Sequence, residues 1–105
     1  MSLRPLSDSE RDAALHKATA ARAARATVKA ELKSGEATVA NVIARSAENE
    51  AIGRLKVSDL LESLPGVGKV RSTAIMEEVG IAATRRVRGL GVHQRAALIA
   101  HLGER

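Results

Sequence analysis

The most informative stretch of the sequence is Leu64–Arg71, which reads Leu-Pro-Gly-Val-Gly-Lys-Val-Arg. Pro65 cannot continue a helix, because its ring removes a backbone donor and clashes with the preceding turn. Gly66 and Gly68 favour a tight turn, and the segment Lys69–Val79 that follows contains neither glycine nor proline. The pattern therefore predicts a short helix that ends at Pro65, a turn, and a second helix that begins directly after the turn.

This turn has the composition of a phosphate-binding site. Backbone N–H groups at the start of a helix point outward together, and they receive phosphate oxygens when no bulky side chain blocks the approach. We therefore expect phosphate contacts from Gly66, Val67, Gly68, Lys69 and Arg71. The alternative is that a tight turn between helices needs glycine for steric reasons alone.

A second cluster of cations follows in the segment Thr84–Gly91, which reads Thr-Arg-Arg-Val-Arg-Gly-Leu-Gly. Its three arginines, Arg85, Arg86 and Arg88, cannot all enter a core, and guanidinium groups suit bidentate phosphate contacts or insertion into a minor groove. The alternative is a solvated loop paired with the acidic residues Glu77–Glu78. We expect the three arginines to contact a nucleic acid.

A long helix precedes both clusters. Ser7 and Glu10 have the spacing of a capping box, Gly35 is a natural stop, and no glycine or proline lies between them. At about 1.5 Å per residue this helix would be roughly 40 Å long, which is more than a small core can cover. Part of it should therefore project as an arm.

One face of this long helix is basic. Its cations fall within a sector of very roughly 80°, and Glu31 lies well outside that sector. The sector holds Arg11, Arg22, Arg25, Lys29 and Lys33. A solvated helix face is the alternative, but no acidic residue interrupts the stripe after Arg11. The stripe favours a phosphate-binding ridge.

The remaining pattern is helical throughout. Apolar periodicity predicts further helices from about Thr38 to Asn49, from a cap at Ser58–Asp59 to Leu64, and from about His93 to Leu102, with an uncertain connector over Ile52–Lys56. The fold class is therefore all-α, with about five helices. Residues 1–36 should form the helical arm, and residues 37–105 the DNA-binding domain. The side chains expected inside are Val39, Val42, Ile43, Leu60, Leu61, Leu64, Val70, Ala74, Ile75, Val79, Ala97, Leu98 and Leu102.

The composition restricts the partners. The 105 residues carry a formal charge of +5, which favours a polyanion, and they include no aromatic residue for base stacking. Without cysteine, neither a disulfide nor a thiolate metal site can form, and a reducing cytoplasm is permitted. No run is long enough to span a membrane, and the first ten residues lack the apolar core of a secretory signal. We expect a soluble protein inside the cell, without a membrane partner.

Catalytic groups are hard to assemble from this sequence. His16, His93 and His101 fall on different expected helices, and none lies at ligand spacing from another. Glu77 and Glu78 are adjacent, so they lie on different sides of a helix and do not form a converging acid pair. We expect no enzyme, no metal site and no cofactor.

These motifs closely resemble the actinobacterial integration host factor family. The resemblance lies in Gly53–Ser58, Leu64–Arg71, Ile75–Met76, Gly80–Ile81 and Arg85–Gly91, together with the Arg and Lys spacing of the first helix, so it covers nearly the whole chain. The block from Gly-Val-Gly-Lys to Arg-Arg is similar, more distantly, to the helix–two-turns–helix module of ribosomal protein S13, which contacts RNA.

The resemblance implies a five-helix protein in which a long N-terminal helix projects from a small bundle with a helix–two-turns–helix motif. Such a nucleoid-associated protein binds double-stranded DNA mainly through its backbone, bends or compacts it, and assists site-specific recombination with phage integrase complexes. A monomer in the cytoplasm, at the nucleoid, is implied. The DNA contacts implied are Gly66, Gly68, Lys69, Arg71, Arg85, Arg86, Arg88, Arg22, Arg25 and Lys29. A structured-RNA-binding module and a helical protein–protein adaptor remain the alternatives.

Overall fold

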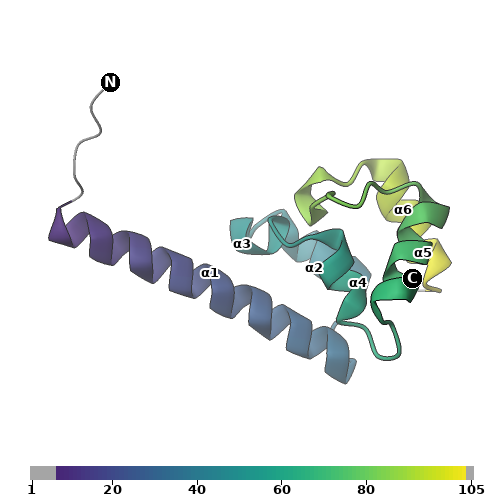
Figure 1. Cartoon of the computed structure of the whole chain (residues 1–105), viewed down its shortest axis with the longest axis horizontal. Coiled ribbons are helices and arrows are strands. Elements are labelled where there is room, and N and C mark those ends of the chain that lie inside the picture. The colour runs from purple at the N-terminus through teal and green to yellow at the C-terminus, as the bar shows by residue number, and fades with distance from the viewer. Residues whose placement is uncertain (1–6, 104–105) are drawn as a thin grey trace.

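The computed structural model describes residues 7–103, so the first six residues of the expected arm and the last two of the expected domain lie outside the described part. The elements in chain order are α1 (Asp8–Ser34), α2 (Val39–Ser46), α3 (Glu50–Gly53), α4 (Val57–Glu62), α5 (Lys69–Val79), the short 3₁₀ helix η1 (Val87–Gly89) and α6 (Val92–His101). In Figure 1, α1 projects from a bundle formed by the other helices. The all-α class and the projecting N-terminal helix are confirmed, with six α-helices in the described part rather than about five.

The long helix α1 begins and ends where the local signals predict. The N–H group of Glu10 donates to Oγ of Ser7 at 3.2 Å, and Gly35 follows the last turn with a left-handed φ of 84°. α1 buries only Val28 and Leu32, both near its C-terminal end. Its last turns therefore pack on the bundle, while the N-terminal part projects beyond it (Figure 1).

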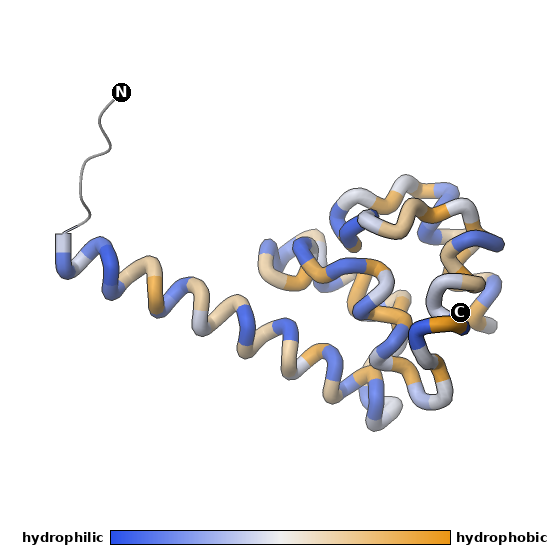
Figure 2. Tube along the Cα trace, viewed as in Figure 1, coloured by the Kyte–Doolittle hydropathy of each residue, from blue (hydrophilic) through white to orange (hydrophobic). Residues whose placement is uncertain are grey.

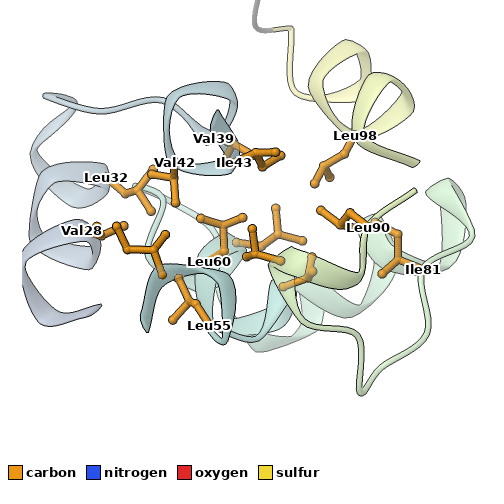
Figure 3. Packing of buried hydrophobic residues seen from close by; sticks show 14 of the residues in the cluster. Val28, Leu32, Val39, Val42, Ile43, Leu55, Leu60, Ile81, Leu90 and Leu98 are labelled. Carbon is orange, nitrogen blue, oxygen red and sulfur yellow. The ribbon is translucent and has the colours of Figure 1, made fainter. Parts of the chain in front are cut away.

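The core lies between the end of α1 and the short helices of the bundle. Figure 2 shows the most hydrophobic residues gathered in this bundle, and Figure 3 shows their side chains meeting from several helices. The core is entirely aliphatic apart from one methionine, because the chain has no aromatic residue. The largest fully buried apolar side chains are Val28, Leu32, Val39, Val42, Val57, Leu60, Leu61, Val87 and Leu98.

The segment after α2 forms a further helix, α3, which extends into the connector expected over Ile52–Lys56. α2 ends at Ser46 rather than near Asn49, because Asn49 caps the next helix. Its side-chain oxygen accepts hydrogen bonds from the N–H groups of Ala51 and Ile52, at 3.0 Å and 3.4 Å. Ile52 is buried in the short helix α3, so the connector begins only after Gly53.

The inward face of α5 differs from the expected one. Val70 is 87% exposed and Ala74 is also exposed, so the prediction that they lie inside was wrong. The helix instead buries Ile75, Met76 and Ser72. The hydroxyl of Ser72 donates to the backbone carbonyl of Ser58 in α4 at 3.3 Å. A polar side chain therefore lies on the buried face of α5, where apolar periodicity predicted Val70.

The last helix was predicted correctly in part. α6 buries Leu98, as expected, and Leu102 at its end is half-buried. Ala97 is exposed, so its predicted burial was wrong. The buried face of α6 is therefore narrower than its apolar pattern predicted, because α6 packs at the outer end of the bundle, against α5 and α2.

Candidate nucleic-acid interface

A short antiparallel pairing joins the segment before α4 to the arginine cluster. The N–H group of Val57 donates to the carbonyl of Arg85 at 3.0 Å, and that of Val87 donates to the carbonyl of Leu55 at 2.8 Å. The side chains of Leu55, Val57 and Val87 are buried. Because side chains alternate along extended backbone, the residues between them face solvent. The pairing also explains why α4 begins at Val57 and not at the predicted cap, Ser58.

The solvent side of this pairing forms one wall of a cleft of about 500 Å³. Cationic side chains reach it from α1, from the connector between α3 and α4, and from the segment around η1. We call it the cation cleft. Its cations are Arg25, Lys29, Arg54, Lys56, Arg86 and Arg88. The acidic Asp59 also lines the cleft, so positive charge greatly exceeds negative charge there and an anionic ligand is attracted.

Arg86 and Arg88 lie close to α3 and to Arg54, the residue that follows α3. Nη1 of Arg86 donates to the carbonyl of Arg54 at 2.6 Å. A Cβ atom on Gly53 would lie 3.3 Å from Cβ of Arg88, so the absence of a side chain at Gly53 lets the arginine segment approach α3 closely. Arg86 and Arg88 are both exposed. Since a guanidinium group has five donors, the single bond made by Arg86 leaves others available to a ligand.

The helix α1 brings Arg25 and Lys29 to the cleft. Both side chains are half-buried, and Nη1 of Arg25 makes a long contact of 3.5 Å with the carbonyl of Ala51 in α3. Glu31, which the sequence placed away from the basic stripe, pairs with Arg45 of α2 at 3.3 Å. The negative charge of Glu31 is therefore compensated outside the cleft.

The glycine-rich turn lies apart from the cation cleft. Gly66 has a φ of 76°, which favours glycine, and Gly68 begins α5 without a side-chain cap. A Cβ atom on Gly68 would meet nothing within 4 Å, and Lys69 and Arg71 are exposed. The first N–H groups of α5 are thus accessible to an anion. Val67 is half-buried and packs against the core.

The structure sorts the predicted DNA-contact residues into four groups. Those that meet in the cation cleft are Arg25, Lys29, Arg86 and Arg88. Arg22 lies one turn before Arg25 on α1, and the turn residues form a separate patch. Arg85 lies beside the cleft and is not part of its lining.

Sequence reasoning missed Arg54 and Lys56 as site residues. They follow α3 in the connector, and only the pairing with a segment about thirty residues later brings them to the cleft. A signal for one of them was present in the sequence. Apolar residues lie on either side of Lys56, and this alternation is typical of an exposed side chain in extended backbone.

Other kinds of site are not evident between residues 7 and 103. No helix in that range is both long enough and apolar enough to cross a membrane. No group of three or more His, Asp or Glu side chains in the described part could hold a metal ion. His101 contacts Glu78 at 3.4 Å, at the surface of the molecule.

Comparison with known proteins gives consistent matches. The family model described as an S13-like H2TH domain, the helix–two-turns–helix fold, matches residues 32–102. The integration host factor of Streptomyces coelicolor is 55% identical over 103 residues, covering 98% of this chain and 96% of the relative. That of Mycobacterium tuberculosis is 50% identical over 103 residues, covering 98% of each. A solved structure of sIHF bound to an 8-base-pair palindromic DNA is 56% identical, with a TM-score of 0.80, and the match covers 82% of this chain and 97% of that one.

Proposed function

Because the chain belongs to the integration host factor family and carries its S13-like helix–two-turns–helix domain, we propose that it binds double-stranded DNA as an architectural protein. The similar solved structure holds a palindromic DNA, and the named relatives are integration host factors rather than enzymes. The observation that carries the proposal is the cation cleft, where cations from separate segments of the chain converge.

The cleft suits phosphate groups rather than base edges. Arginine and lysine side chains bind phosphates and release condensed counterions, which gives an affinity that depends on salt but not on sequence. Arginine can read guanine as well as bind phosphate, but none of the described residues that line the cleft is Asn or Gln, the side chains that read adenine. Specificity should therefore come from the shape and deformability of the DNA.

The glycine-rich turn supplies a second phosphate contact in this proposal. Gly66, Val67 and Gly68 form the turn, and Lys69 and Arg71 add positive charge at the start of α5. A protein that holds DNA at two separate patches can impose a path between them, which is the requirement for bending or compacting DNA. Arg22 would extend the contact along α1.

Family membership supports the finer parts of the proposal. These are assistance to site-specific recombination in phage integrase complexes, action as a monomer, and a location at the nucleoid in the cytoplasm. The projecting part of α1 buries no residue before Val28, which leaves it available to DNA or to such a complex.

A direct test compares three nucleic acids side by side. Duplex DNA, single-stranded DNA and a structured RNA hairpin of equal length are titrated against the protein over a range of salt concentrations. We expect the duplex to bind most tightly and with little dependence on its sequence. Tighter binding of the RNA hairpin would favour the S13-like alternative, and no binding to any of the three would favour an adaptor.

The second patch can be tested by Gly68→Ala. Position 68 has a φ of −93° and open space around a Cβ atom, so alanine should not disturb the fold. If phosphate approaches the N–H groups of α5, the added methyl group should lower the affinity for duplex DNA several-fold, measured by fluorescence anisotropy. Gly91→Ala is the matched control, because Gly91 begins α6 in a similar way. Wild-type affinity for folded Gly68→Ala would show that this turn faces away from DNA.

A further inference from the structure

The arginines of the second cluster do not share one environment. Arg86 and Arg88 are exposed, whereas Arg85 is half-buried. Nη1 of Arg85 donates to the carbonyl of Gly89 at 3.2 Å. Nε of Arg85 is buried and has no hydrogen-bond partner in the described part of the chain. The backbone carbonyl of Arg85 accepts the N–H of Val57 at 3.0 Å. Both its backbone and its side chain are thus engaged within the protein.

This engagement restricts the donor pairs through which Arg85 could bind phosphate. A guanidinium group makes bidentate contacts through two parallel N–H groups, either from both Nη atoms or from Nε and one Nη atom. In Arg85, Nη1 is bonded to Gly89 and Nε is buried. The donor pair that includes Nε is therefore closed to phosphate, and of the pair formed by Nη1 and Nη2, one N–H group of Nη1 is already engaged by Gly89.

The absence of a side chain at Gly89 leaves room for the side chain of Arg85. A Cβ atom on Gly89 would lie 3.1 Å from Cδ of Arg85 and 3.6 Å from its Nη1. The first distance is shorter than an ordinary contact, so the arginine side chain would have to move. Gly89 is not among the glycines with positive φ. A side chain at position 89 would thus crowd Arg85, which would have to shift by a few tenths of an ångström, and would not strain the backbone.

We propose that Arg85 is a positioning residue that closes the loop from residue 85 to residue 89 and holds Arg86 and Arg88 at the cation cleft. In this proposal Arg85 acts on DNA binding through Arg86 and Arg88 and not through a phosphate contact of its own. The inference rests on the proposed function and assigns a separate role to one of its arginines. Ordering a loop on binding costs free energy, and a contact that fixes the loop backbone beforehand reduces that cost.

Two variants test this role. Arg85→Met removes the charge and the bond but keeps most of the volume, and Gly89→Ala displaces the Arg85 side chain without removing any charge. We expect both to lower the affinity for duplex DNA by about 5- to 30-fold, because Arg86 and Arg88 are less ordered before binding. In a plot of log affinity against log salt, both lines should lie below the wild-type line and parallel to it. The control Gly91→Ala should stay within about twofold of wild type, because a Cβ atom there meets only Gln94, at 3.8 Å.

A direct phosphate contact by Arg85 gives a different result. Each lost contact lowers the salt slope by about 0.9, so Arg85→Met would bind with a shallower slope while Gly89→Ala would bind like wild type. That pair of results would overturn the inference. In the double variant, the positioning role predicts little further loss beyond either single variant, since both remove the same contact.

A measurement without DNA separates this inference from the proposed function. In the unliganded protein, the Nε–H signals of Arg86 and Arg88 in ¹⁵N NMR spectra should show order that both Arg85→Met and Gly89→Ala reduce. Unchanged signals in both variants would contradict the positioning role even if DNA binds as proposed. If wild-type protein failed to bind duplex DNA, the proposed function would fail, and the NMR result would still decide whether Arg85 orders its neighbours.

Discussion

Replacing Arg86 and Arg88 together by alanine should lower the affinity for duplex DNA by at least roughly 100-fold. Each exposed arginine supplies charge-assisted hydrogen bonds to phosphate worth about 1.5–3 kcal/mol, and about 1.4 kcal/mol corresponds to tenfold in affinity. The melting temperature should stay close to wild type, because neither side chain is buried. Affinity is measured by fluorescence anisotropy with a duplex, and stability by thermal circular dichroism.

A matched control removes the same charge elsewhere. The variant with both Arg11→Ala and Lys33→Ala loses two exposed cations that do not line the cleft. Because neither side chain lines the cleft, this variant loses only part of the general attraction between protein and DNA, and the affinity should fall by less than about fivefold. Equal losses in the two double variants would mean that net charge, and not the cation cleft, controls binding.

Leu32→Ala should lower the free energy of unfolding by about 2–5 kcal/mol, the usual range for truncating a buried leucine. Leu32 is only 1% exposed and, with Val28, fixes α1 to the bundle. Because that docking brings Arg25 and Lys29 to the cleft, duplex affinity should fall as well, even under conditions where the variant is folded. The measurements are urea unfolding followed by circular dichroism and the same anisotropy titration.

Leu15→Ala is the control for this variant. Leu15 lies on the projecting part of α1 and is 62% exposed, so its removal should change the free energy of unfolding by no more than about 0.5 kcal/mol. If Leu32→Ala and Leu15→Ala had the same stability, α1 would not be docked through its last turns. The contribution of α1 to the cleft would then lose its structural basis.

Local signals in the sequence predicted the ends of α1 and α5 well. The capping box from Ser7 to Glu10 and the stop at Gly35 set the bounds of α1, because both depend on contacts within one turn of helix. α5 begins after the glycine-rich turn and ends before Gly80, as predicted, for the same reason. The class of fold and the projecting arm followed from these bounds and from the small number of apolar residues in α1.

Features that depend on distant segments were not predictable in the same way. The rotation of α5 follows its partner α4, which receives Ser72, and a helical period cannot indicate that Val70 faces solvent. Likewise, Arg54 and Lys56 enter the cation cleft through a pairing too short to give a strand signal. The sequence predicts a site at the arginine cluster, but it did not indicate the segments that line the cation cleft beside that cluster.

In the proposed function, DNA binding by this protein depends most directly on phosphate contacts in the cation cleft. The decisive measurement is the slope of log affinity for duplex DNA against log salt, for the wild type and for the variant with both Arg86→Ala and Arg88→Ala. We expect a steep wild-type slope, and a slope lower by about 1.8 in the variant, since each lost phosphate contact removes about 0.9. Parallel lines for the two proteins, or wild-type binding that barely changes with salt, would contradict the account.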